Sequence, residues 1–313
     1  MNEQEMLSRM KSPRDKRECW RGGVVQIHII RSCDKSCFHC TQISNIRGKA
    51  AIMTPGQFRV AVETLRDHFG VTGIFGGNPC MHPQFEEICA ILREAIPFER
   101  RGLWSNNPMG KGRICRETFN PLVSNLNVHL DAAAHAEFLR DWPETEGTIN
   151  LKGLQEDSRH GPPFVAMADV GYTDEQINEN AATCDVNQKW SSLIGVFRGE
   201  LRAYFCELAY AQAALHAEDP DWPDTGMPVV PRWWDHSMEH FAEQVRFHCR
   251  RCGMPIKAEG QLAIGGEREQ VSETHAAWYR PKTPGRPVEL VTSIDQLGAG
   301  RVPSATSYLP IVP

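Results

Sequence analysis

Three closely spaced cysteines are the residues of this sequence whose types and spacing point most directly to chemistry. Cys33, Cys37 and Cys40 form a C-x3-C-x2-C pattern, directly after a run of β-branched and apolar residues at 24–30. Three thiolates on one short loop can hold three corners of a cubane iron–sulfur cluster. The fourth iron is then left without a protein ligand, and an open metal position is a catalytic feature because another molecule can bind there. Zinc binding and buried structural cysteines are the alternative interpretations of this pattern.

Four more cysteines lie far downstream and form a second candidate metal site. They are Cys184, Cys206, Cys249 and Cys252, spaced C-x21-C-x42-C-x2-C. Four protein thiolates can ligate every iron of a second cubane cluster, or they can hold a structural zinc. His240 and His248 stand close to the last two cysteines and keep zinc as an alternative.

The elements that must position the first site alternate between strand and helix. Buried runs predict strands at 24–30, 71–75, 102–104 and 126–130. Apolar stripes predict helices at 54–69, 83–96 and 113–123, the first opening with a capping box from Thr54 to Gln57. This alternation is typical of a parallel sheet or barrel. Farther along, we expect a strand at 164–170, a helix at 173–183, a hairpin of 193–196 with 201–205, and a helix at 237–247.

Polar or glycine-rich segments follow each of the four predicted strands, where α/β barrels build their active sites. The Cys loop follows the first strand, and Gly76-Gly77-Asn78-Pro79 ends the second. Ser105-Asn106-Asn107 ends the third, and His129-Leu130-Asp131 ends the fourth. Paired glycines let the backbone approach a ligand closely, since side chains would block it.

The Cys triplet followed by Gly76-Gly77-Asn78-Pro79 resembles the signature of the radical S-adenosylmethionine (radical SAM) superfamily. The second motif is similar to the family's GGEP, which holds the amino group of SAM; Asn78 stands where the family usually has Glu. An amide oxygen can still accept a hydrogen bond from an ammonium group. The resemblance covers about residues 24–170 and implies a partial (β/α)6-type TIM barrel within the α/β class.

The resemblance also implies which residues do the chemistry. Cys33, Cys37 and Cys40 would hold the catalytic 4Fe-4S cluster, where reductive cleavage of SAM yields a 5′-deoxyadenosyl radical that abstracts hydrogen from a substrate C–H. SAM would be bound by residues of the strand ends and by the histidine before the last cysteine. These cofactor-binding candidates are His39, Gly76, Gly77, Asn78, Pro79, Ser105, Asn106, His129 and Asp131.

The downstream cysteines are similar to those of twitch, a shortened form of the SPASM auxiliary-cluster domain appended to many radical SAM enzymes. The resemblance implies a second, auxiliary 4Fe-4S cluster held by Cys184, Cys206, Cys249 and Cys252 in a small α+β domain. We therefore expect an arm at 1–23, a partial barrel at 24–170, an auxiliary-cluster domain at 171–279 and an extended tail at 280–313.

Composition excludes some classes of protein and leaves others open. The chain of 313 residues has a net charge of −5, without the basic footprint of a nucleic-acid binder. No apolar run is long enough to span a membrane, and the charged N-terminus lacks a signal-peptide core, so we expect a cytoplasmic protein. The resemblance implies a one-electron donor such as flavodoxin or ferredoxin.

The substrate expected from the sequence is a small molecule such as a sugar or nucleoside. A radical SAM maturase that modifies a peptide is the alternative within the family; the 23-residue arm is too short for the peptide-recognition domain such enzymes often carry. A zinc-containing binding or scaffold protein is the alternative from another class.

Overall fold

A single eight-stranded sheet forms the centre of the computed structural model. The structure describes residues 1–16, 23–47, 51–129, 131–150, 162–190, 192–256, 261–262, 269–297 and 301–302. The strand order is β5-β4-β3-β2-β1-β6-β7-β8. The six strands from β5 to β6 run parallel, β7 pairs antiparallel with β6, and β8 pairs antiparallel with β7. The protein is therefore of the α/β class, with an open and mostly parallel sheet, as the sequence predicted.

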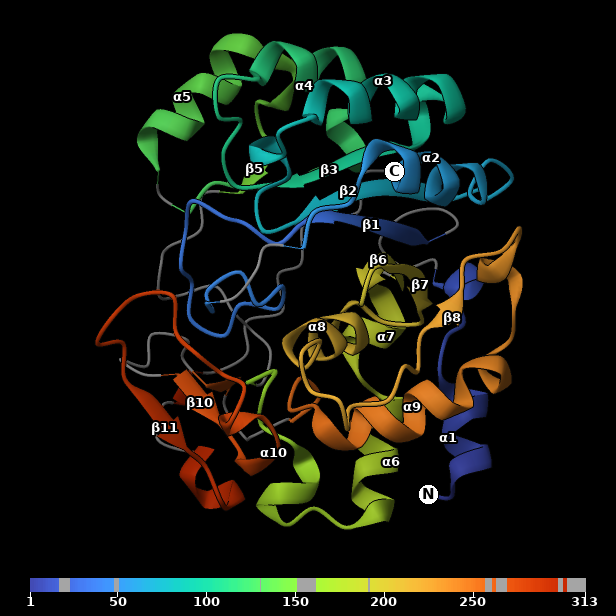
Figure 1. The fold of residues 1–313 in the computed structure, drawn as a ribbon, viewed down its shortest axis with the longest axis vertical. Helices are drawn as coiled ribbons and strands as arrows, with labels where there is room; N and C mark the ends of the chain where they lie inside the picture. Colours follow the sequence, from blue (N-terminus) through green and yellow to red (C-terminus); the bar gives the residue numbers. More distant parts are fainter. Residues whose placement is uncertain are drawn as a thin grey trace.

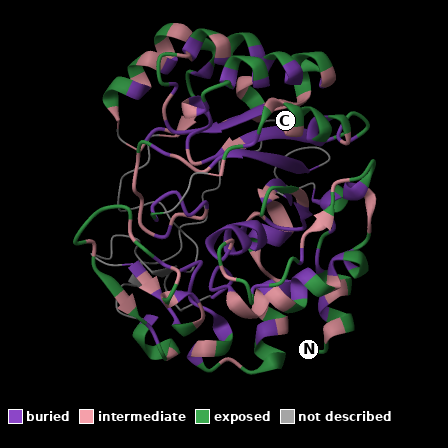
Figure 2. Ribbon diagram, in the orientation of Figure 1, coloured by how far each residue is buried: buried purple, intermediate pink, exposed green. Residues whose placement is uncertain are grey.

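The first half of the chain supplies five parallel strands and the helices between them. In chain order the elements are β1 (Val24–Ile30), α2 (Pro55–Glu63), β2 (Val71–Gly76), α3 (Phe85–Ala95), β3 (Arg101–Ser105), α4 (Gly112–Thr118), β4 (Asn125–Asn127), α5 (Ala132–Asp141) and β5 (Ile149–Asn150). Helices α2 to α5 cover one face of the sheet (Figure 1). Strands β1, β2 and β3 are mostly buried, β4 and β5 are partly exposed, and the helices alternate buried and exposed residues (Figure 2).

The remaining elements lie on the other side of the sheet or extend it. They are α1 (Glu3–Arg9), α6 (Asp174–Ala182), α7 (Asp185–Lys189), β6 (Ser192–Phe197), β7 (Glu200–Tyr204), α8 (Glu207–Leu215), β8 (Met227–Pro228), α9 (Ala242–His248), β9 (Gln261–Leu262), β10 (Glu269–Val271), α10 (Glu273–Ala276), β11 (Val288–Leu290) and β12 (Arg301–Val302). Strand β6 pairs directly with β1, so a segment predicted for the auxiliary domain continues the sheet of the barrel part.

Several elements form where local sequence signals predicted them. Thr54 and Gln57 form the capping box at the start of α2, and Thr173 and Gln176 form a second one at α6. The hairpin predicted at 193–205 is β6 and β7. Helix α2 is shorter than predicted: it ends at Glu63, and Phe69, which was predicted to lie on its apolar face, is exposed.

The strand predicted at 164–170 is wrong. Met167–Val170 is a 3-10 helix, and Ala166 donates its backbone N–H to the Ser272 hydroxyl rather than to a neighbouring strand. Asp169 accepts hydrogen bonds from the side chains of Ser272 and Thr274. This segment is therefore held by contacts with the distant C-terminal part of the chain.

The C-terminal part returns to the loop that follows β1. Ile46 forms a β-bridge with Pro281, and Lys282 N–H donates to the Asn45 carbonyl at 2.7 Å. In Figure 1 the loop after β1 lies between the sheet and the region of β10, β11 and α10. None of the helices that the structure describes is long and apolar enough to cross a membrane.

Candidate functional site

The ends of four neighbouring parallel strands bring the first group of predicted site residues together. Strands β1, β2, β3 and β4 are adjacent, so the loops that follow them meet at one edge of the sheet. The Cys33 Sγ lies 3.6 Å from Asn106 Oδ1, which follows β3. The Cys37 Sγ lies 3.9 Å from the Nε2 of His129, which follows β4. Residues predicted from three separate strand ends thus surround one loop.

Two of the three thiols of this loop, those of Cys33 and Cys37, lie in a largely desolvated environment. Burial raises the pKa of Cys33 to about 12, partly offset by a hydrogen bond from the Lys35 backbone, while the other two thiols raise it further. Burial also raises the pKa of Cys37 to about 12, with Cys40 as the next cause. The Cys40 Sγ lies 3.1 Å from the Ser44 hydroxyl. Such thiols become thiolates when they ligate a metal, because coordination removes their protons.

The paired glycines allow close packing against the chain's own backbone. A Cβ at Gly76, whose φ is +153°, would lie 2.2 Å from the Ile30 carbonyl oxygen. A Cβ at Gly77 would lie 2.3 Å from the Ser32 carbonyl oxygen. These glycines let the end of β2 pack against the start of the Cys loop, where Gly77 N–H donates to Ile30 O at 2.8 Å. In the described structure their close approach is to the chain's own backbone.

The fully buried side chain of Asn78 is saturated with hydrogen bonds from within the protein. Its Nδ2 donates to Asp34 Oδ1 and to the Asn107 carbonyl, each at 3.0 Å. Its Oδ1 accepts from the Cys80 backbone N–H at 3.1 Å and lies 3.0 Å from the Ser105 hydroxyl. Because the Cys80 N–H is only a donor, this contact fixes the orientation of the amide. Pro79 follows as the first residue of a 3-10 helix, Pro79–Met81.

Asp34, which the sequence analysis did not single out, is at the centre of this polar group. Its Oδ1 accepts from Asn78 Nδ2 and, at 2.9 Å, from Asn106 Nδ2. Burial opposes ionisation of this carboxyl, but the hydrogen bonds from Asn106 and Asn78 prevail, and the pKa of Asp34 is lowered overall. Asp34 is therefore an ionised carboxylate next to Cys33. Its position inside the C-x3-C-x2-C motif was the available signal.

Asp131 and His39, both predicted to contact SAM, have partners of their own. Asp131 caps the N-terminus of α5 by accepting from Ala134 N–H, and its Oδ2 lies 2.6 Å from Lys35 Nζ. The hydrogen bond from Lys35 lowers the pKa of Asp131. His39 is buried with a φ of +50°, and its backbone N–H donates to the Glu269 carboxylate.

A buried network from the C-terminal part holds the Cys loop in place. Glu269 accepts hydrogen bonds from His39 N–H and Asn45 Nδ2, and it forms a 2.8 Å ion pair with Arg286. Arg286 also donates to the Ser36 carbonyl. Lys282 Nζ donates to the Cys33 carbonyl at 2.6 Å. We call Asn45, Glu269, Tyr279, Lys282 and Arg286 the loop clamp; no local pattern in the sequence indicated it.

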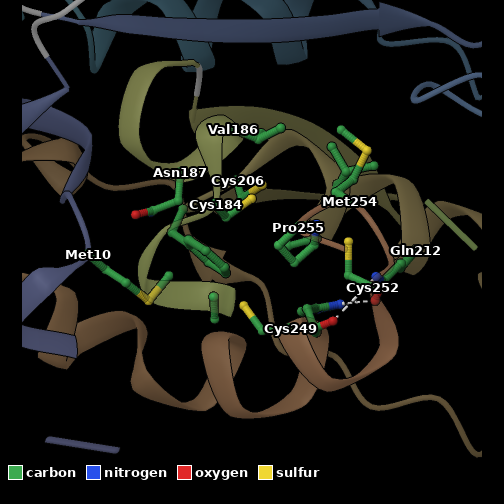
Figure 3. A pocket seen from close by; sticks show the side chains of 15 residues that line it. Met10, Cys184, Val186, Asn187, Cys206, Gln212, Cys249, Cys252, Met254 and Pro255 are labelled. Carbon is green, nitrogen blue, oxygen red and sulfur yellow. Dashed lines mark hydrogen bonds between the residues drawn. The ribbon is translucent and has the colours of Figure 1, made fainter. Parts of the chain in front are cut away.

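The four downstream cysteines line one pocket below the sheet (Figure 3). They come from four places: the junction of α6 and α7, the end of β7, and the two ends of the 3-10 turn after α9. Burial raises the pKa of Cys206 to about 12 and raises those of Cys184, Cys249 and Cys252. The structure thus brings together residues separated by up to 68 positions (252 − 184).

Two polar side chains near this pocket bear on what it holds. The Nδ1 of His248 pairs with Gln212 at 2.9 Å and its Nε2 with Thr225 at 2.7 Å, so both ring nitrogens have partners. Lys16 is fully buried, and its Nζ donates to the Phe205 carbonyl at 2.6 Å. Burial lowers the pKa of Lys16 to about 8, and the charges that oppose this come first from Cys206 and Cys184.

Neither cysteine group converges on one point. Among the described residues, no three His, Cys, Asp or Glu side chains form a group that could hold a single metal ion. Zinc needs its four ligands about 2.0–2.3 Å from one centre, whereas a cubane cluster binds each thiolate through a different iron.

The remaining described cysteines belong to neither candidate metal site. Cys80, Cys89 and Cys115 are completely buried, and the Cys80 and Cys115 sulfurs lie 3.9 Å apart. Cys19 lies outside the described residues.

Comparison with known proteins gave matches only among solved structures. No protein-family model and no curated protein matches the sequence. The structure is similar to that of BtrN in complex with AdoMet and 2-DOIA, with 13% identity over 74% of this chain and 92% of that one, and a TM-score of 0.38. It is also similar to BtrN in an open conformation, with 11% identity, 77% and 90% coverage, and a TM-score of 0.36. By its own sheet topology, the chain has the open α/β fold that its resemblance to the radical SAM superfamily predicted, with the C-x3-C-x2-C loop directly after the inner strand β1.

Proposed function

We propose that this protein is a radical SAM enzyme whose catalytic 4Fe-4S cluster is held by Cys33, Cys37 and Cys40. The observation that carries the proposal is that polar side chains from the ends of β3 and β4, Asn106 and His129, lie against the Cys33 and Cys37 thiols of the Cys loop. Three thiolates suit a cubane cluster with one open iron, and the surrounding amides and carboxylates suit a polar ligand of that iron. When bound there, the cluster supplies the electron that cleaves SAM and so produces the 5′-deoxyadenosyl radical.

The protein's own residues would position and shield this chemistry. The loop clamp fixes the backbone of residues 33–45 through Glu269, Lys282 and Arg286, so the thiols need little reorganisation when the cluster binds. Asn106 and His129 lie against two of the three thiols and restrict the approach of water. Water exclusion protects a reactive radical from side reactions.

We propose that Cys184, Cys206, Cys249 and Cys252 hold an auxiliary 4Fe-4S cluster in a twitch-like segment. The four thiols line one shared pocket, which supports a metal site whose ligands all come from the protein. His248 contributes no free ring nitrogen in the described structure, which removes one ligand that zinc would use. Four thiolates around a metal centre give the site a net negative charge, and this charge would compensate the buried ammonium group of Lys16, which is costly without a compensating charge. With all four ligands supplied by protein, the site serves electron transfer or structure.

The substrate class in this proposal is a small molecule, and the reductant is a one-electron donor such as flavodoxin or ferredoxin in the cytoplasm. These assignments rest on the sequence resemblance. Peptide modification is the alternative that a substrate search should include.

Metal analysis after anaerobic reconstitution tests the proposal against a zinc-binding scaffold. Two cubane clusters give about eight irons per chain, and about four should remain when Cys33, Cys37 and Cys40 are replaced together by Ala. Replacing Cys249 and Cys252 should remove the other set. Stoichiometric zinc with about four irons would contradict the auxiliary cluster alone, and zinc without iron would contradict the radical SAM assignment.

A further inference from the structure

The amide of Asn78 has no hydrogen-bonding capacity left for a ligand. Both Nδ2 hydrogens are used, by Asp34 and by the Asn107 carbonyl. Its oxygen faces the Cys80 N–H and the Ser105 hydroxyl. A ligand amino group could reach this oxygen only by displacing a protein donor, which would leave a buried polar group unpaired. The acceptor for a cationic ligand must therefore come from another residue.

Asp34 has the acceptor that Asn78 lacks. Asn78 and Asn106 both donate to its Oδ1, which anchors the carboxylate from one side. Its Oδ2 has only longer contacts, 3.4 Å to Asn107 Nδ2 and 3.9 Å to Lys35 Nζ. The side chain is 18% exposed, and Oδ2 has fewer close donors than Oδ1 and so retains acceptor capacity for a ligand. Because Asp34 Oδ1 also lies 3.8 Å from Cys33 Sγ, a group held by this carboxylate is adjacent to the candidate cluster.

The neighbouring charges leave Asp34 without a dedicated counter-ion. Lys35 is the closest cation, but its Nζ lies 2.6 Å from Asp131 Oδ2 and 3.9 Å from Asp34 Oδ2. The two carboxylates and the one ammonium group together carry a net charge of −1. A ligand bearing a positive charge or several N–H donors would complete this arrangement.

We propose that Asp34 is the carboxylate that accepts from the amino group of SAM, with Asn78 and Asn106 as positioning residues that hold it. This inference rests on the proposed function, because it takes SAM as the ligand of the Cys33 loop. An amine bound to the open iron keeps N–H donors, and Asp34 Oδ2 accepts from them. In this chain, Asp34 of the Cys motif would thus supply the carboxylate that the family has as Glu in its GGEP motif.

The test is SAM binding by Asp34→Asn, measured calorimetrically on anaerobically reconstituted protein. An Asn oxygen can replace Oδ1 and keep both amide contacts, while its NH2 group replaces the acceptor Oδ2 with a donor. Loss of this charge-assisted hydrogen bond should raise the dissociation constant for SAM about tenfold to hundredfold. Glu94→Gln is the matched control, because it removes an exposed carboxylate on α3 that pairs with Arg59 on α2.

A SAM analogue with hydrogen in place of the α-amino group separates a direct contact from a structural effect. Asp34→Asn should weaken binding of this analogue less than threefold. Asp34→Glu keeps a carboxylate and should retain most of the preference of the wild type for SAM over the analogue. Equal losses for the two ligands, or a SAM dissociation constant of Asp34→Asn within threefold of wild type, would overturn the inference. Wild-type protein that binds no SAM would overturn the proposed function itself.

Discussion

Hydrogen bonds to a single buried amide connect three of the strand-end loops. Asn78 follows β2, its partner Asp34 follows β1, and its partner Ser105 ends β3. Removing this amide would leave several buried donors and acceptors unpaired at once. The residue thus has a structural role in addition to any effect on a ligand.

Asn78→Ala should therefore destabilise the protein before any ligand is added. Each unpaired buried group costs about 1–3 kcal/mol, so a loss of at least about 2 kcal/mol in the free energy of unfolding is expected. Denaturant unfolding of the metal-free protein measures it, with the exposed Gln84→Ala as control. Unchanged stability would show that the Asn78 hydrogen bonds contribute little.

Lys16 provides a second prediction at the scale of one residue. A buried positive charge favours the more negative, reduced state of a nearby cluster, so Lys16→Met should make the reduction potential of the auxiliary cluster more negative. Redox titration followed by electron paramagnetic resonance measures the potential. Lys11→Met, an exposed change on the same segment, should leave it unaltered; equal potentials in all three proteins would contradict the role of Lys16.

At this scale, the sequence predicted residues with distinctive types and spacing but not their partners. The cysteine triplet and the polar strand ends could be found because parallel strands place their carboxyl ends at one edge. Asp34 was not identified, because its place inside the cysteine motif did not reveal its hydrogen bonds to Asn78 and Asn106. The pattern Gly76-Gly77 did not indicate that the Ile30 and Ser32 carbonyls also require glycine at these positions.

Among the elements, the segment from β10 to β11 has the most direct influence on the candidate site. Its Glu269 and Arg286 form a buried ion pair that contacts the Cys loop through His39 and Ser36. Removing one partner of a buried ion pair lowers the stability of the fold, because the other charge is left uncompensated.

Glu269→Gln should therefore loosen the Cys loop. We expect a loss of about 3–5 kcal/mol in stability and faster amide hydrogen exchange in residues 33–47. Hydrogen-exchange mass spectrometry of the metal-free protein checks this. The double variant Glu269→Gln with Arg286→Met also removes the unpaired guanidinium group, so it should restore part of the protection against hydrogen exchange. Unchanged exchange in Glu269→Gln would contradict the role of the loop clamp.

The elements that the sequence analysis missed lacked a clear local pattern. Helix α8 is buried along nearly its whole length, so it has no polar face to mark a helical period. The 164–170 segment is apolar like a strand, but Ser272, about a hundred positions away, takes its backbone hydrogen bond. By contrast, the capping boxes at Thr54 and Thr173 are local signals and were sufficient.

For the whole molecule, the sheet joins the two candidate metal sites. Strand β1 carries the Cys33 loop at its end and pairs with β6, whose hairpin partner β7 leads to Cys206. The pocket cysteines tie α6, β7 and α9 together, so a metal there would stabilise the packing of these elements.

Replacing Cys249 and Cys252 together by Ala should consequently loosen the packing of α6, β7 and α9 without changing the Cys33 loop. Limited proteolysis should cut the region 171–256 faster, while iron at the Cys33 loop and SAM binding persist. Cleavage no faster than in wild type would contradict a structural contribution from the second metal site.

The central claim is that the Cys33, Cys37 and Cys40 loop holds a cluster that cleaves SAM. The most direct measurement is the formation of 5′-deoxyadenosine and methionine by the reconstituted, reduced protein, followed by liquid chromatography. We predict that wild type produces both and that the variant with all three cysteines replaced by Ala produces neither, although it keeps the downstream cluster. Undiminished 5′-deoxyadenosine formation by that variant would contradict the account.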